Sequence, residues 1–513
     1  MGTQIMHFLE RLDENIRTYP DKLALEFLDP PLQRFTYAEL DAVIRQCAAY
    51  LVDLGVQPED RVALQLPKCL EFIVLHLASI RIGAITLPLN TAYPAAELAY
   101  FLDDSGARLF FGDDEARQEI ESTLAQLPTL ERYTFLDYRS PSQFEEMVAN
   151  TTIPENSQQQ YSHDADTTVS MIYTSGTTGR PKGAMITAGN LTSNLDALHT
   201  AWGWRSDDLL LHALPMFHVH GLITSFHGAL HAGASTLALR KFDAHRVLQL
   251  LVDRKCSVFM GVPTIYQRIL AVPDAARFDL SRMRLLTSGS DRLPDENFLA
   301  FRETFGHTLL ERYGMTETGM NISNPLEGER RMGSVGLPLP GVEARIVDPE
   351  TGEPLSDGQA GAVQIRGPNV FKGYWRQPEK TAAAFSPHGW LRTGDLGLRE
   401  PDGYFTLKGR AKDLIITGGF NVYPPEVERV LNEHDAVKTG VVIGCPDADW
   451  GERVVAVVVT EPRESVSAED LVRFCRERLA AYKCPKEIIF TQSLPRNAMG
   501  KVQKVKLRQE LCG

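Results

Sequence analysis

The sequence predicts an α/β protein with a large N-terminal domain of layered helices and sheets, then a small β-rich subdomain and a small α+β C-terminal domain. Its 513 residues are more than one hydrophobic core usually serves. Up to about residue 410, helical patterns alternate with short runs rich in Val, Ile and Leu, such as RVALQLP, LLLHALP and CSVFMGVP. Buried strands that alternate with helices are typical of parallel sheets.

The remaining segments follow from local composition. The apolar stretch FIVLHLASIRIGAITLPL contains His76 and Arg81 and ends at prolines, so it predicts a core helix and strand and not a membrane span. The polar stretch NTTIPENSQQQYSHDADTT predicts a surface linker. After residue 333 glycine and proline become frequent, which predicts short strands and turns. From Gly409 onward, runs such as KTGVVIGCP and RVVAVVVTEP predict the compact α+β domain.

Composition narrows the class of partner and the compartment. The net charge of −13 gives no electrostatic reason to expect a nucleic-acid partner or an anionic membrane. Seven scattered cysteines without a CxxC pair predict reduced thiols and no zinc site. The N-terminus carries acidic residues too early for a signal peptide, and the C-terminal ELCG is no peroxisomal address. We therefore expect a cytoplasmic protein.

A glycine- and hydroxyl-rich loop stands in MIYTSGTTGRPKGAMIT, directly after a short apolar strand. Glycines let successive backbone N–H groups turn toward one centre, hydroxyls add donors, and a lysine adds positive charge. This loop suits a polyphosphate, although it lacks the Gly-Lys-Ser/Thr ending of a Walker A sequence. The residues concerned are Thr174, Ser175, Gly176, Thr177, Thr178, Gly179 and Lys182.

The stretch GVPTIYQRIL leaves the role of one arginine open. Val-Pro ends a strand, and Thr264 is expected to cap the helix that follows. Ile265 and Ile269 share one helix face, and Arg268 lies at its edge. Periodicity allows Arg268 either to be a solvated charge or to reach into a pocket.

Further motifs follow the phosphate loop in a fixed order: YGMTET, WLRTGDLG, GRAKDLIITGGFNVYPPEVE and LPRNAMGKVQK. Over nearly its whole length the chain resembles the adenylate-forming superfamily of acyl-CoA synthetases, peptide-synthetase adenylation domains and beetle luciferases. The resemblance implies an enzyme that uses ATP and Mg²⁺ to convert a carboxylic acid to an acyl-adenylate with release of pyrophosphate. In the synthetases, the thiol of coenzyme A then displaces AMP.

The same resemblance assigns the nucleotide site. The loop from Thr174 to Lys182 would hold the β- and γ-phosphates, and Thr316 would bond the α-phosphate. Glu317 would bind Mg²⁺, a hard cation that favours carboxylate oxygen. The adenine would stack on Tyr313, the ribose hydroxyls would bond Asp395, and Arg410 would reach the ribose or phosphate.

Lys501, in NAMGKVQK, matches the catalytic lysine of the superfamily, where positive charge offsets the negative charge that develops on phosphate and carboxylate. The family rotates its small domain between half-reactions, and the hinge position falls on Lys412. The resemblance therefore implies an N-terminal domain of residues 1–411 and a mobile C-terminal domain of residues 412–513. After rotation, Gly418 and Gly419 would allow close passage of the pantetheine of coenzyme A.

Within the superfamily the chain resembles malonyl-CoA synthetases, through LPLNTAY, HALPMFHVHGL, GVPTIYQRIL, SGS and ERYGMTETGMNISNP. His218 would gate the pocket near the carboxylate, and His220 is expected to be structural. Asp291 and Arg292 depart from the small apolar residues that are common in this group. A polar lining suits a second carboxylate better than a long chain, and its residues are His218, Arg268, Ser288, Ser290 and Met315.

Other functions remain open at this stage. The enzyme could activate a fatty or aromatic acid, with Arg268 merely solvated. It could also be a stand-alone adenylation enzyme that loads a carrier protein in trans. A catalytically inactive nucleotide-binding relative is disfavoured, because Glu317, Asp395 and Lys501 are all present.

Overall fold

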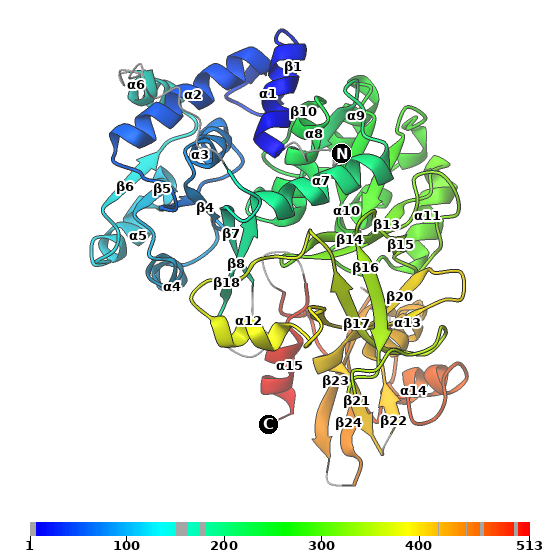
Figure 1. Ribbon diagram of the computed structural model, residues 1–513. Coiled ribbons are helices and arrows are strands. Elements are labelled where there is room, and N and C mark those ends of the chain that lie inside the picture. Colours follow the sequence, from blue (N-terminus) through cyan, green and yellow to red (C-terminus); the bar gives the residue numbers. More distant parts are fainter. Residues whose placement is uncertain are drawn as a thin grey trace. The chain divides into compact units, whose positions relative to one another are not determined.

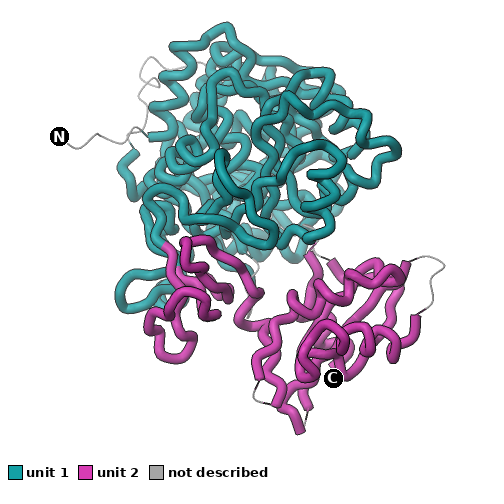
Figure 2. Tube along the Cα trace, turned by 90° about the vertical axis from the view of Figure 1, so that its right-hand side faces the viewer, with its two compact units in different colours: residues 1–343, 365–391 teal, residues 344–364, 392–513 magenta. Residues whose placement is uncertain are grey.

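The computed structural model describes residues 7–149, 163–174, 180–418, 420–447, 449–461, 466–496 and 501–512. It divides into two compact units, residues 1–343 with 365–391 and residues 344–364 with 392–513 (Figure 2). Unit 2 therefore combines most of the β-rich segment with the C-terminal α+β segment. The domain boundary between residues 411 and 412 stays a prediction.

Unit 1 contains two large sheets (Figure 1). The nine-stranded sheet has parallel strands at its centre and antiparallel strands at its edges. Its strands, in spatial order, are β15 (Leu337–Pro338), β14 (Gly319–Ser323), β13 (Leu310–Met315), β12 (Leu285–Ser288), β11 (Val258–Gly261), β9 (Leu209–His212), β10 (Ser235–Ala238), β1 (Leu23–Phe27) and β2 (Gln33–Thr36).

The seven-stranded sheet is likewise parallel except at one edge. Its strands, in spatial order, are β18 (Gly373–Tyr374), β8 (Lys182–Thr187), β7 (Thr168–Thr174), β4 (Ile85–Pro88), β3 (Arg61–Gln65), β5 (Leu109–Asp113) and β6 (Arg132–Leu136). Parallel strands that alternate with helices confirm the predicted α/β class.

The helices of unit 1 pack on these sheets. They are α1 (Phe8–Thr18), α2 (Tyr37–Asp53), α3 (Leu70–Arg81), α4 (Ala95–Ser105), α5 (Arg117–Leu124), α6 (Ser142–Ala149), α7 (Ala188–Trp202), α8 (Gly228–His231), α9 (Ala244–Asp253), α10 (Pro263–Leu270), α11 (Asp295–Phe305) and α12 (Pro378–Ala384), with the π-helix η3 (His220–His227) and the short 3₁₀ turns η1 (Asp114–Ala116) and η4 (Ala275–Arg277).

Helix α3 is the core helix that the sequence predicted. Every one of its residues is buried, as expected for a helix that is apolar on most sides. Arg81 at its end is neutralised by Asp13 and Asp41, at 2.6 and 2.9 Å, so its charge is buried without being unpaired. Across the described residues, no helix is long and apolar enough to cross a membrane.

Unit 2 holds the remaining two sheets. The four-stranded sheet consists of β16 (Glu343–Val347), β17 (Gly361–Arg366), β19 (Leu391–Arg399) and β20 (Phe405–Arg410). After the short turn η5 (Ala411–Asp413), the five-stranded sheet contains β21 (Ile415–Thr417), β22 (Phe420–Val422), β23 (Val437–Asp447), β24 (Gly451–Thr460) and β25 (Glu487–Phe490). Its helices are α13 (Pro424–Asn432), α14 (Ala468–Arg476) and α15 (Lys504–Leu511).

Alternation along β23 and β24 gives this last sheet two apolar faces. One face packs on α13 and α14, with Leu471 among the buried residues. The other face packs on α15, with Leu507 at its centre. The two helices α14 and α15 accordingly lie on opposite sides of the β23–β24 pair (Figure 1).

The cysteine prediction is wrong for one pair. Cys445 on β23 and Cys512 after α15 form a disulfide, with their Cα atoms 5.2 Å apart. Because α15 packs on β23, residues 67 positions apart in sequence become neighbours, and their spacing gives no signal of it. The other five cysteines are free and buried. This pairing removes the cysteine argument for a reducing compartment.

Candidate active site

The predicted phosphate loop joins two antiparallel strands of unit 1. Thr174 ends β7 and Lys182 begins β8, and the two are paired across the strands. Residues Ser175, Gly176, Thr177, Thr178 and Gly179 lie outside the described residues. The ends of the loop are therefore held by the sheet, as expected for a loop that must present backbone donors to a ligand.

Lys182 lies close to the predicted magnesium ligand Glu317. The ammonium of Lys182 is 4.0 Å from the ring centre of Tyr374, and the Tyr374 hydroxyl donates a 2.8 Å hydrogen bond to Oε1 of Glu317. Burial and the Glu317 charge raise the pKa of Tyr374, while burial lowers the pKa of Lys182 despite the opposing charge of Glu317. This cluster places a cation and a carboxylate beside the end of the phosphate loop.

Tyr374 was not predicted from the sequence. It belongs to the two-residue edge strand β18, which pairs with β8 through Tyr374 and Ala184. A strand of only two residues is too short to show a periodic pattern in the sequence. The Gly-Tyr-Trp stretch was visible, but nothing in the sequence placed it beside Glu317.

The turn between β13 and β14 carries three predicted nucleotide residues. Tyr313 is buried on β13, Thr316 is half-buried in the turn, and Glu317 is buried at 6% exposure. Gly319 closes the turn at φ +62°, where an added Cβ would lie 2.3 Å from the Asn194 side chain. The turn is thus held in one geometry by a position that only glycine fits.

In unit 2 the two remaining nucleotide candidates face one another. Asp395 on β19 and Arg410 on β20 are paired across the antiparallel strands. Nε of Arg410 lies 2.9 Å from Oδ1 of Asp395, which is 6% exposed. Asp395 is also fixed through its backbone N–H, which donates to the Thr393 hydroxyl at 3.1 Å. The sheet thus fixes this carboxylate in orientation.

The predicted hinge and catalytic lysine lie in the C-terminal part of unit 2. Lys412 is exposed in η5, and Lys501 is exposed just before α15. Gly418 adopts φ +56° at the tip of the β21–β22 turn, and an added Cβ there would lie 2.8 Å from the Trp450 ring. Gly419 and the residues 497–500 lie outside the described residues.

The segment predicted to line the acyl pocket forms β11 and α10. The helix begins at Pro263 with Val262 as its N-cap, so the expected cap at Thr264 is wrong. Proline is pre-organised for the first helical position, so the helix starts two residues earlier than a cap at Thr264 would give. Ile265 and Ile269 are buried, and Arg268 is exposed beside them.

A second arginine, which the sequence analysis missed, is completely buried. Arg312 on β13 is 2% exposed, and its Nε and Nη2 have no hydrogen-bond partner. Burial lowers its pKa to about 9 although the neighbouring Tyr266 opposes the shift. An added Cβ at Gly289 would lie 2.6 Å from its Cζ, so the guanidinium occupies space that only glycine leaves. A buried guanidinium with two unsatisfied donors calls for an anion.

Ser288 and Ser290 flank Gly289, whose backbone lies against this arginine. Ser288 ends β12 and is fully buried, and its hydroxyl has no hydrogen-bond partner. Ser290 adopts φ +71°, a strained value for a residue other than glycine, and its hydroxyl is 3.3 Å from Nδ1 of His220. The predicted Met315 is half-buried at the end of β13. Unsatisfied polar groups thus gather where β12 and β13 end.

The two histidines of HALPMFHVHGL differ in environment. His220 is buried, and burial, followed by the Arg312 charge, lowers its pKa well below the usual value, so it is neutral at pH 7. It begins the π-helix η3, a geometry frequent at functional sites. His218 is half-buried next to Phe217. Within the described part of the chain, no group of His, Cys, Asp or Glu is arranged to hold a metal ion.

Glu311 does not neutralise Arg312, because consecutive residues of a strand point to opposite faces. It is 3% exposed, and burial raises its pKa from 4.5 to about 8. Its Oε1 accepts the Leu293 backbone N–H at 3.2 Å, while Oε2 has no partner. The carboxyl is therefore mostly protonated at pH 7, and the charge of Arg312 remains available.

Replacing Glu311 with glutamine is expected to remove a pH dependence of stability. The raised folded-state pKa means that Glu311 contributes stability that is present below pH 4.5 and lost as pH rises toward 8. The thermal midpoint of the wild type should therefore fall relative to that of Glu311→Gln between pH 5 and 8. Melting curves at one fixed scan rate measure the difference. A difference that stays constant over this range would contradict the assignment.

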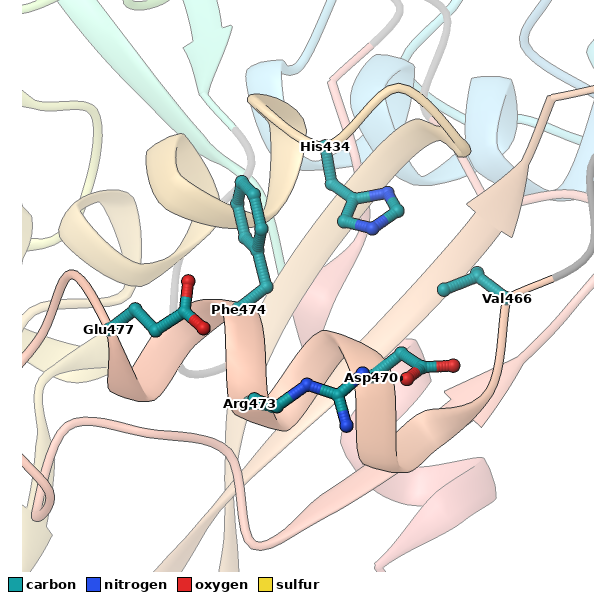
Figure 3. Close-up of a pocket in the computed structure, with 6 residues that line it drawn as sticks. All are labelled: His434, Val466, Asp470, Arg473, Phe474 and Glu477. Atoms are coloured by element: carbon teal, nitrogen blue, oxygen red, sulfur yellow. Dashed lines mark hydrogen bonds and ion pairs between the residues drawn. The ribbon is translucent and has the colours of Figure 1, made fainter.

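A surface pocket of about 310 Å³ lies elsewhere in unit 2, between the end of α13 and α14 (Figure 3). The residues that line it are His434, Val466, Asp470, Arg473, Phe474 and Glu477. None of them was predicted for a site, and Asp470 and Arg473 pair with each other.

The chain is similar to known proteins over most of its length. The model of the AMP-binding enzyme family matches residues 12–375, and that of the AMP-binding enzyme C-terminal domain matches residues 426–501. The mitochondrial malonate–CoA ligase ACSF3 of Mus musculus is 37% identical over 89% of this chain and 83% of its own length. A long-chain-fatty-acid–CoA ligase of Bacillus subtilis is 32% identical over 97% of this chain and 93% of its own. The crystal structure of ATP-bound MatB from Rhodopseudomonas palustris has a TM-score of 0.92 at 41% identity and covers 99% of both chains.

The chain therefore belongs to the AMP-binding enzyme family, which confirms the resemblance read from its motifs. It is an acid–thiol ligase, an AMP-forming acyl-CoA synthetase.

Proposed function

We propose that this synthetase activates malonate or a substituted malonate. The observation that carries the proposal is Arg312, a buried guanidinium whose Nε and Nη2 have no partner and which lies against Gly289, between Ser288 and Ser290. A guanidinium offers a planar two-donor fork that matches a carboxylate. A substrate with two carboxylates supplies one to the adenylation chemistry and the other to this arginine.

Arg268 is proposed to take part in the same recognition. It is exposed on α10, next to the buried face that Ile265 and Ile269 form, and a long arginine side chain at that edge can reach a bound carboxylate. Ser290 and its partner His220 add polar groups, His218 gates the pocket, and Met315 supplies an apolar wall. A fatty acid would gain nothing from such a lining, because burying an unpaired cation against an alkyl chain is costly.

The names of the relatives support this choice without deciding it. One relative is a malonate–CoA ligase, whereas the Bacillus relative of similar identity is named for long-chain fatty acids. The alternatives are therefore a fatty-acid or aromatic-acid CoA ligase, or an enzyme that loads a carrier protein in trans. Arg312 favours the dicarboxylate over each of them.

ATP is proposed to bind through the residues that the motifs assigned. The phosphate loop Thr174–Lys182 and Thr316 hold the phosphates, Tyr313 stacks on adenine, and Asp395 with Arg410 takes the ribose side. Glu317 supplies a buried carboxylate for Mg²⁺, and Tyr374 fixes the orientation of that carboxylate. The donor chemistry fits a hard cation that offsets phosphate charge.

Coenzyme A is proposed to pass the β21–β22 turn, where Gly418 and Gly419 stand. Trp450 lies directly against Gly418 and is 46% exposed, an unusual exposure for so large an aromatic side chain. Lys486 lies 5.0 Å from its ring. An exposed ring beside a cation suits the adenine and phosphates of coenzyme A.

Trp450→Ala is therefore expected to raise KM for coenzyme A by about 10-fold, as loss of one base–aromatic stack of about 1–3 kcal/mol would. ATP–pyrophosphate exchange, which needs no coenzyme A, should be unchanged. Steady-state kinetics with varied coenzyme A measure the effect. Phe490→Ala is the matched control, because Phe490 is a similarly exposed aromatic on β25. An unchanged KM would remove Trp450 from the coenzyme A site.

Lys412 is proposed as the hinge about which residues 412–513 turn between the half-reactions. Lys501 then acts in adenylation, and the Gly418 turn acts in thioester formation. Two separate segments of one domain would serve successive steps, which requires that the domain turn as a rigid body.

One experiment tests the proposed function as a whole. Pyrophosphate release is measured over malonate, methylmalonate, butyrate, octanoate and a cinnamate, with and without coenzyme A. Malonate or methylmalonate should give the highest kcat/KM, with turnover dependent on coenzyme A. Preference for octanoate or cinnamate would refute the dicarboxylate, and turnover that needs a carrier protein would favour the loading enzyme.

A further inference from the structure

The segment that carries Lys501 is tied to the hinge through helix α15. Directly before this helix, the backbone N–H of Gln503 donates to the carbonyl of Pro495 at 2.8 Å, and Arg496 and Val502 form an antiparallel bridge. The chain that holds Lys501 is thus closed at its base, and its position follows that of α15.

Helix α15 is fixed on one side by apolar packing. Leu507 is 4% exposed and packs with Val441, Ile443 and Val457 of the β23–β24 sheet. This packing sets how far the helix lies from the sheet. It does not by itself fix the helix along its axis, because apolar contacts are not directional.

The disulfide from Cys512 to Cys445 holds the C-terminal end of the helix against β23, and two charges on the adjoining face hold the rest of it in direction. Lys504 and Arg508 are four residues apart and therefore share a face of α15. The Lys504 ammonium lies 2.6 Å from Oε1 of Glu428, and Nη2 of Arg508 donates to Oδ1 of Asp413 at 2.9 Å.

These pairs connect α15 to two different elements. Glu428 belongs to α13, and its Oε1 also accepts the Val442 backbone N–H of β23 at 2.8 Å. Asp413 is the last residue of η5 and directly follows the hinge residue Lys412. Its carboxylate is 15% exposed and the Arg508 side chain 25%, so the pair is shielded from water more than ordinary surface pairs.

We propose that Asp413 and Arg508 are positioning residues for adenylation, which couple the conformation of the hinge to the position of Lys501. When η5 changes direction at Lys412, the Asp413–Arg508 bond carries α15 with it, and Lys501 moves as part of the same body. The pair acts only through Lys501 and takes no part in thioester formation. This inference rests on the proposed roles of Lys412 and Lys501.

The test separates the two half-reactions in Arg508→Met and Asp413→Asn. Adenylation, followed as malonate-dependent ATP–pyrophosphate exchange, should fall about 10-fold, because a misplacement of about 1 Å can cost about 10²-fold and the apolar packing of α15 keeps the displacement smaller. Thioester formation from preformed acyl-AMP should change less than about 2-fold, since that step does not use Lys501. The control is Lys506→Met, an exposed cation of the same helix, which should change neither step.

Two further variants distinguish positioning from a merely structural role. The reversed pair Asp413→Arg with Arg508→Asp should recover most of the adenylation rate. In a Lys501→Ala background, Arg508→Met should lower the adenylation rate no further, because the effects of residues that act through one group are not additive. Equal losses in both half-reactions, failure of the reversed pair, or a further loss in the Lys501→Ala background would each overturn the inference.

The inference and the proposed function fail in different ways. If Lys501→Ala is severely impaired and Arg508→Met adenylates at the wild-type rate, only the coupling is wrong. If Lys501→Ala itself adenylates normally, the proposed role of Lys501 is wrong and the coupling falls with it.

Discussion

Lys501→Ala is expected to slow ATP–pyrophosphate exchange by about 10²–10³-fold, the usual cost of removing one electrostatic stabiliser of a transition state. Negative charge develops on the α-phosphate as the carboxylate attacks it, and a lysine point charge offsets both groups. Thioester formation from preformed acyl-AMP should be much less affected, because no phosphate charge of this kind develops in that step.

The measurement needs both half-reactions on the same preparation. Lys506→Ala is the matched control, since Lys506 is exposed on α15 only five residues away and lies in no site proposed above. Equal loss in both half-reactions would remove Lys501 from its role in adenylation and would favour a general effect on the C-terminal segment.

The fold could be predicted because its signals are local. The alternation of apolar runs with helical patterns gives the two large sheets, and the long, mostly apolar run gives the buried α3 and the strand β4. The glycine- and hydroxyl-rich loop after a strand likewise predicts a phosphate site from consecutive residues, and its assignment stays a prediction.

The parts that could not be predicted depend on contacts between distant segments. Tyr374 contacts Glu317 from an edge strand 57 residues away, and Cys512 meets Cys445 because a helix packs on a strand. Arg312 shows a different limit. It stands next to Tyr313 in a motif, yet only the packing of β12, β13 and α10 reveals that its charge is buried and partly unpartnered.

Arg312→Met is expected to lower kcat/KM for malonate by about 10²–10³-fold, as expected when a buried ion pair loses one partner at about 3–5 kcal/mol. Methionine keeps much of the volume and removes the charge. The free enzyme should remain folded, because the arginine that is lost has an unsatisfied Nε and Nη2 in the absence of substrate. Turnover of butyrate, which brings no second carboxylate, should stay the same or rise.

Arg268→Leu is the companion variant. Because Arg268 is exposed on α10, its pairing with substrate is less shielded from water than that of Arg312, and we expect a loss of about 10-fold for malonate. Gln267→Leu, at the neighbouring exposed position of the same helix, is the control.

Both acids must be measured on every variant, since only the ratio of malonate to butyrate turnover separates recognition of the second carboxylate from a general loss of activity. If Arg312→Met lowers the turnover of malonate and of butyrate equally, the buried arginine stabilises the fold and does not recognise the substrate. If Arg268→Leu leaves malonate turnover unchanged while Arg312→Met abolishes it, Arg268 is a solvated helix charge and Arg312 alone selects the acid.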